Sequence, residues 1–172
     1  MKRPATALLL LMSMAAPACG YHAVGHAVTL PQNVRTIAVP GFVSQSPTFR
    51  VEQVMTDAVV REFNTRTRYH IVPDTTDADT TLRGTVLSTT ASPLTYDTST
   101  GRAASVLVVV SMSVTLSDRG GKVLYQNPAY LFREQYEVSQ DLSSFFEEDS
   151  PAFRRLSQDF ARTLVANILE GF

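Results

Sequence analysis

Few residues in this sequence are of the types that carry out chemistry. There is one cysteine, Cys19, and there are three histidines, of which His22 and His26 stand four residues apart and His70 stands alone. Histidines at this spacing can bind a metal on a helix, but the residues around them show no helical pattern and no carboxylate. The sequence also lacks the G-x-S-x-G and H-E-x-x-H motifs of hydrolases and metalloproteases. We therefore expect no catalytic residues, no metal site and no enzymatic activity.

Cys19 follows a segment that is typical of an export signal. Lys2 and Arg3 precede an uncharged, mostly apolar run over residues 5–16, and small residues stand just before the cysteine. The run is shorter than the ~20 apolar residues that a membrane-spanning helix needs. This pattern resembles a bacterial lipobox, in which the chain is cut before the cysteine and the thiol is acylated. It departs from the usual lipobox by having Ala16, and not leucine, three residues before the cysteine.

The cysteine count supports the same interpretation, because an exported protein with a single cysteine cannot form an internal disulfide. We expect a signal peptide over residues 1–18, followed by Cys19 carrying a covalent diacylglycerol and an N-acyl chain such as palmitate, with no other cofactor. Two or more acyl chains anchor a protein stably in a membrane, whereas one holds it only marginally. The alternative is an ordinary signal peptide whose removal leaves Cys19 as a free thiol.

Composition and charge exclude some classes of partner. The formal net charge of the whole chain is −1, and Lys2 and Arg3 belong to the expected signal peptide, so the remaining chain is more acidic. This balance gives no support to nucleic-acid binding. Lys122 is the only lysine after Lys2, so nearly all the remaining positive charge is arginine. Arginine can bind phosphate or carboxylate in a bidentate manner.

Two amphipathic helices are expected in the part of the chain that follows. Ser46 and Pro47 form a typical helix start, with serine as N-cap and proline in the first turn, and predict a helix over residues 47–64. Ser150 and Pro151 repeat this signal before a second helix over residues 151–170. Apolar residues recur every four positions along this second helix, at Leu156, Phe160, Leu164, Ile168 and Phe172.

Four strands are expected around these helices. The first covers residues 33–39 and the second residues 80–89, where Leu82, Gly84, Val86 and Ser88 share one face. A polar segment over residues 92–101 reads as a long loop. Residues 103–117 then alternate strictly between apolar residues and mainly serine or threonine, which fixes the register of the strand. A glycine turn at residues 118–121 leads to a partner strand from Lys122, with a bulge or sheet edge at Pro128.

These elements predict an α+β fold, a two-layer sandwich in which a four-stranded mixed sheet carries two amphipathic helices on one face. A lipidated arm over residues 19–32 would precede this single domain, which covers residues 33–172. The second face of the sheet would be polar and free to meet water or a polar partner. Its expected members are Arg83, Thr85, Ser111, Ser113, Thr115 and Arg133.

Three short motifs in this order carry a resemblance to a known family. They are C-G-Y-H at residues 19–22, L-P-x-x-V-x-T-I-A-V-P-x-F at residues 30–42, and S-P-T-F-R-V-E at residues 46–52. Together with the order of helices and strands, they resemble the lipopolysaccharide-assembly lipoproteins, or LptE-like family, across essentially the whole mature chain. The resemblance implies a protein of the Gram-negative outer membrane that plugs a large β-barrel translocon, helps to assemble it, and binds lipopolysaccharide during export.

The resemblance also implies contacts between basic side chains and lipopolysaccharide phosphates. Arg102, at the junction of the expected loop and strand, is the first candidate, followed by Lys122, Arg83 and Arg133. For each of them a solvated or structural role remains the alternative. A different kind of protein, a periplasmic lipoprotein that activates a cell-wall synthase, also stays open. The short arm before residue 33 argues against it, because such an activator would have a long tether.

Overall fold

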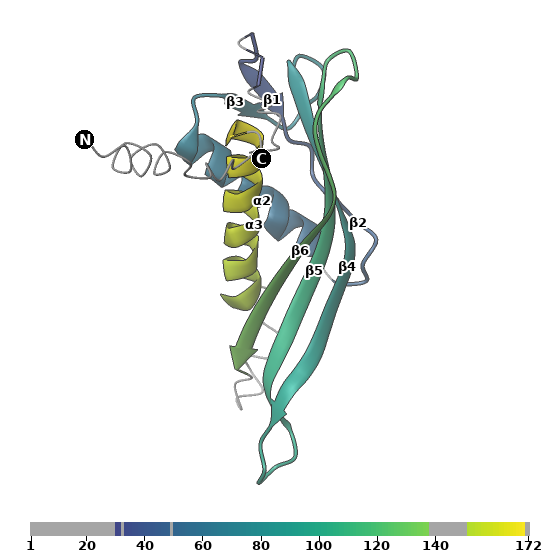
Figure 1. Ribbon diagram of the computed structural model, residues 1–172, viewed down its shortest axis with the longest axis vertical. Helices are drawn as coiled ribbons and strands as arrows, with labels where there is room; N and C mark the ends of the chain where they lie inside the picture. The colour runs from purple at the N-terminus through teal and green to yellow at the C-terminus, as the bar shows by residue number, and fades with distance from the viewer. Residues whose placement is uncertain (1–29, 32, 49, 138–150, 171–172) are drawn as a thin grey trace, which may run out of the picture.

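The computed structural model describes residues 30–31, 33–48, 50–137 and 151–170 (Figure 1). The expected signal peptide, Cys19 and most of the expected arm lie outside these residues. Within them the chain forms two helices and a six-stranded sheet. In chain order the elements are β1 (Thr36–Ala38), β2 (Val43–Ser44), α2 (Val51–Arg66), β3 (His70–Val72), β4 (Thr80–Tyr96), β5 (Ala103–Asp118), β6 (Val123–Glu137) and α3 (Pro151–Glu170).

The sheet is mixed, with strand order β3-β1-β4-β5-β6, and β2 pairs with β4 beyond the end of β1. The strand β1 pairs in parallel with both β3 and β4, and β2 pairs in parallel with β4, whereas β4, β5 and β6 form an antiparallel meander. The α+β class and the mixed sheet are therefore confirmed. The expected number of four strands is wrong, because β2 and β3 are also part of the sheet. These strands have only two and three residues, too few to show an alternating pattern.

The strand β4 differs most from its prediction. It continues to Tyr96, so the first half of the expected loop over residues 92–101 belongs to the strand and pairs with β5. Pairing along β5 satisfies the backbone of this Ser/Thr-rich segment, which carries no apolar pattern of its own. A register shift between Val86 and Ser88 also turns Ser88 outward, where it is exposed opposite Ser111. The prediction that Ser88 shares a face with Leu82 is therefore wrong.

The strand β5 has the register that its alternation predicts. Its inward side chains are buried at Val108, Val110, Met112, Val114 and Leu116, whereas Val106, nearer the β4–β5 turn, is half-buried. The prediction for Pro128 is also confirmed. The proline lies in β6, which is the edge strand of the sheet, beside a register shift opposite the segment between Met112 and Val114.

Both helices lie on the same side of the sheet (Figure 1). The helix α3 has the predicted bounds, and Leu156, Phe160, Leu164 and Ile168 are buried, while Ser150 and Phe172 fall outside the described residues. The helix α2 begins at Val51, so the prediction of Ser46 as its N-cap is wrong. The Ser46 hydroxyl instead accepts a hydrogen bond from the Thr48 amide at 3.3 Å, within a local turn.

An aromatic cluster fastens α3 to the sheet. The ring centroid of Phe160 lies 5.4 Å from that of Phe132, 5.9 Å from that of Tyr130 and 6.4 Å from that of Phe42, each in an edge-to-face arrangement. Nearby, Arg155 in the first turns of α3 donates to Glu134 of β6 at 2.5 Å. The core thus lies between the helices and one face of the sheet, which leaves the opposite face available to other contacts.

Candidate functional site

The face of β4, β5 and β6 that points away from the helices is the predicted polar face. Arg83 pairs with Thr115, Thr85 with Ser113, and Ser88 with Ser111 across β4 and β5. Arg133 extends this face onto β6, opposite Val109. All of these polar side chains are exposed or half-buried. The structure therefore brings the six predicted residues onto one surface, which we call the outer face: Arg83, Thr85, Ser111, Ser113, Thr115 and Arg133.

The four basic candidates for lipopolysaccharide contact do not form one cluster. Arg83 and Arg133 lie on the outer face, Arg102 lies in the β4–β5 turn, and Lys122 lies in the β5–β6 turn. These turns are at opposite ends of β5, whose 16 residues span about 50 Å at the usual rise of a strand. Within the described residues, none of the four basic side chains forms a hydrogen bond or an ion pair. Each is therefore available separately.

The turn that contains Arg102 ends a hairpin that reaches beyond α3 (Figure 1). Asp97 organises this turn: its Oδ1 accepts hydrogen bonds from the amides of Ser99 and Thr100, both at 2.8 Å, and from both of their hydroxyls. These bonds, first of all that from the Ser99 hydroxyl, lower the pKa of Asp97 to about 2. Leu94 and Tyr96 stand exposed beside the turn. Sequence reasoning did not single out these three residues, because it interpreted residues 92–101 as one long loop and named only Arg102 at its end.

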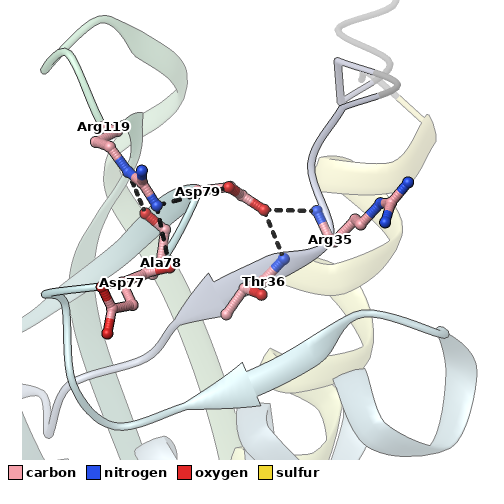
Figure 2. Close-up of polar contacts among 6 residues, drawn as sticks. All are labelled: Arg35, Thr36, Asp77, Ala78, Asp79 and Arg119. Atoms are coloured by element: carbon pink, nitrogen blue, oxygen red, sulfur yellow. Dashed lines mark hydrogen bonds and ion pairs between the residues drawn. The ribbon is translucent and has the colours of Figure 1, made fainter.

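A second polar cluster lies at the other end of the meander, around Asp79 (Figure 2). Its Oδ2 accepts hydrogen bonds from the amides of Arg35 at 2.9 Å and Thr36 at 3.0 Å. These two amide bonds, more than the nearby arginines, hold the pKa of Asp79 below its usual value.

Arg119, in the β5–β6 turn, completes this cluster. Its guanidinium donates to the backbone carbonyls of Ala78 at 3.2 Å and Asp77 at 3.1 Å, and lies 3.8 Å from Asp79 Oδ1. The Arg119 guanidinium therefore binds both the backbone of the loop before β4 and the Asp79 carboxylate at the end of that loop. These polar contacts satisfy backbone groups at this end of the sheet, so the role of the cluster is structural.

The described residues contain no group of three or more His, Cys, Asp or Glu side chains placed to hold a metal ion, and His22 and His26 lie outside them. Neither described helix is both long and apolar enough to cross a membrane.

Comparison with solved structures shows proteins with a similar fold, two of which are described as lipoproteins. A putative lipoprotein from Caulobacter crescentus has a TM-score of 0.53 at 11% identity, covering 75% of this chain and 88% of the other. An uncharacterised lipoprotein B from Nitrosomonas europaea has a TM-score of 0.51 at 14% identity, covering 81% and 88%. The hypothetical protein CT253 from Chlamydia trachomatis has a TM-score of 0.53 at 10% identity, covering 79% and 96%.

The sequence comparisons identify the family. A search of curated proteins gave no match. The family model described as "LptE: Lipopolysaccharide-assembly" matches residues 34–168, which include every described helix and strand except the last two residues of α3. Because this match spans most of the chain, the protein belongs to the LptE family of lipopolysaccharide assembly.

Proposed function

We propose that this protein is an outer-membrane lipoprotein that plugs the lumen of a large β-barrel lipopolysaccharide translocon and helps that barrel to assemble. Acyl chains on Cys19 would anchor it on the periplasmic side of the membrane. The observation that carries the proposal is the family match over residues 34–168. Family membership supports a role in lipopolysaccharide assembly in general, and the barrel, the anchor and the direct lipopolysaccharide contacts are what we add.

The outer face supports the proposed fit into a barrel. The lumen of a large transmembrane barrel is polar and filled with water. Ser, Thr and Arg side chains can hydrogen-bond to such a wall, and the outer face presents them on three adjacent strands. The buried apolar side chains of β5 point the other way, into the core with the helices, whereas Leu107 and Val109 are half-buried on the outer face. The domain can therefore meet a polar wall without giving up its own core.

The exposed basic side chains support contact with lipopolysaccharide. Phosphate groups bind arginine through two parallel charge-assisted hydrogen bonds. Arg102 at the hairpin tip has no carboxylate partner among the described residues, and neither do Arg83, Arg133 and Lys122 on the meander. Because these cations are spread along the sheet, they would contact several points of a moving lipid in succession. The protein would act by binding, with no bond made or broken.

Purification of the tagged full-length protein from detergent-solubilised envelopes tests the proposal. We expect a large outer-membrane β-barrel protein to co-purify, and intact-mass measurement to show diacylglycerol and an N-acyl chain on Cys19. A matched Cys19→Ser variant should lose the acyl mass. Recovery with an inner-membrane cell-wall synthase, or recovery of the acylated protein without any barrel, would overturn the proposal. An unmodified thiol at Cys19 would remove the anchor from it.

A further inference from the structure

Asp79 joins three parts of the chain that are far apart in sequence (Figure 2). It binds Thr36 through both polar groups of that residue's backbone: the Thr36 amide donates to Asp79 Oδ2, and the Asp79 amide donates to the Thr36 carbonyl, each at 3.0 Å. The Arg35 amide donates to the same carboxylate oxygen. The Asp79 carbonyl accepts a hydrogen bond from the Arg119 amide at 3.1 Å, on the side of the β5–β6 turn.

The start of β1 depends on this side chain because the strand itself is short. β1 has three residues, and its pairing with β4 covers only Ile37 with Thr80 and Ala38 with Thr81. The amides of Arg35 and Thr36 lie before this pairing, so the Asp79 carboxylate takes the place of a strand partner. On the other side, the Arg35 carbonyl accepts from the His70 amide at 2.8 Å.

The β5–β6 turn depends on the same loop. The Arg119 guanidinium holds the carbonyls of Asp77 and Ala78, the two residues just before Asp79, and lies within ion-pair distance of its carboxylate. The Asp79 side chain is 32% exposed and that of Arg119 is 66% exposed, so the ion pair is screened by water and the directed hydrogen bonds contribute more. Loss of the Asp79 carboxylate would thus weaken the contacts of this loop with the start of β1 and with the β5–β6 turn.

We propose that Asp79 is a positioning residue that latches the start of β1 to the β5–β6 turn, so that these two segments open together when its carboxylate is removed. The helices and the strands β4, β5 and β6 stay folded during this opening, because core side chains such as Leu82 and Val114 lie outside the two latched segments. If the proposed function holds, the latch also fixes the point at which the lipid-linked arm joins the body of the protein.

Hydrogen exchange on the full-length protein in detergent, comparing Asp79→Ala with the unaltered chain, tests this coupling. We expect the amides of Arg35, Thr36 and Arg119 to exchange faster by about tenfold or more, and by similar factors, as expected when charged hydrogen bonds are lost. The amides of Met112 and Val114 in the core should keep their rates. The matched control is Asp77→Asn, which removes one charge from the same loop but keeps the Asp77 carbonyl that binds Arg119.

Faster exchange at Arg35 and Thr36 alone would overturn the proposal, because it would mean that the β5–β6 turn opens independently. Equal acceleration at every amide, or the same pattern in the Asp77→Asn control, would overturn it too. If Asp79→Ala does not fold, Arg119→Ala provides the reciprocal test, in which the amide of Thr36 should exchange faster although it does not contact Arg119. These rates involve neither a barrel nor lipopolysaccharide, so failure here is distinguishable from failure of the proposed function.

Discussion

Gly84 of β4 is a residue at which one added methyl group should reduce the stability of the fold. A Cβ at this position would lie 2.8–2.9 Å from ring carbons of Phe42, which is buried and contacts Phe160. We expect Gly84→Ala to lower the free energy of unfolding by about 1–3 kcal/mol, as overpacking of a core does. Urea unfolding followed by circular dichroism measures this loss.

Gly41 offers the matched control, since a Cβ there has no atom within 4 Å. Gly41→Ala should change the free energy of unfolding by no more than about 0.5 kcal/mol. Equal effects of the two substitutions would mean that Phe42 does not pack against Gly84 as described.

Asp97 gives a prediction about pH at the hairpin tip. Hydrogen bonds to its carboxylate lower its pKa to about 2, so they stabilise the turn above the ordinary pKa of aspartate. This contribution is lost as the pH falls through about 2. NMR titration should show the amide signals of Ser99 and Thr100 moving with a midpoint near pH 2. In Asp97→Asn this movement should be absent; a midpoint near the ordinary aspartate value of about 4 would contradict the described contacts.

Sequence reasoning failed for two kinds of residue. Some have hydrogen-bond partners far away in the sequence, and others can form either of two local structures. Asp79 binds Arg35 and Thr36 across more than 40 positions of the sequence, and nothing in its neighbourhood indicates such partners. Ser46 has the residue type of an N-cap, but its hydroxyl serves a turn that ends before the helix. Serine favours turns and N-caps for the same physical reason, so the sequence alone does not separate them.

At the scale of elements, a strong repeat of apolar residues was sufficient to predict a helix or a strand and its bounds. β5 and α3 were predicted almost to the residue because burial repeats every second position in one and every third or fourth in the other. The outer part of β4 has no such signal. It becomes a strand because β5 offers a continuous row of backbone partners. The short strands β2 and β3 depend in the same way on their neighbours in the sheet.

The attachment of α3 to the sheet can be tested at Phe160. This side chain is fully buried and contacts the rings of Phe42, Tyr130 and Phe132. We expect Phe160→Ala to cost about 3–5 kcal/mol of stability in thermal or chemical unfolding, because it leaves a cavity between helix and sheet. Gln158→Ala, at an exposed position of the same helix, should be close to neutral. A loss below about 1 kcal/mol at Phe160 would show that α3 is not held by this cluster.

At the scale of the whole molecule, the placement of Arg102 and Lys122 predicts how their effects combine. They lie at opposite ends of β5, too far apart to bind one phosphate together. If both contact lipopolysaccharide, Arg102→Glu and Lys122→Glu should each weaken its binding in vitro. Their free-energy changes should add in the double variant, as they do for independent sites. Arg61→Glu on α2 carries the same charge change away from the sheet and should leave binding unaltered; unchanged binding in the double variant would remove both residues.

The sequence predicted the polar outer face better than it predicted where Arg102 and Lys122 lie. Alternation in β5 was enough to expect a polar outer face, and the pairing of Thr85 with Ser113 and of Arg83 with Thr115 places these residues on it together. The positions of Arg102 and Lys122 depend on the length of the two hairpins. The true end of β4 was not visible in the sequence, and so neither was the distance of Arg102 from the body of the domain.

Photo-crosslinking in intact cells tests the central claim most directly. A photoreactive residue replaces Arg83 or Arg133 on the outer face, and in a control it replaces Thr163, an exposed residue of α3 on the helix side. The proposed function predicts that both outer-face positions give adducts with the same large outer-membrane β-barrel protein, in higher yield than Thr163. Adducts with an inner-membrane synthase, or no barrel adduct from either outer-face position, would contradict it.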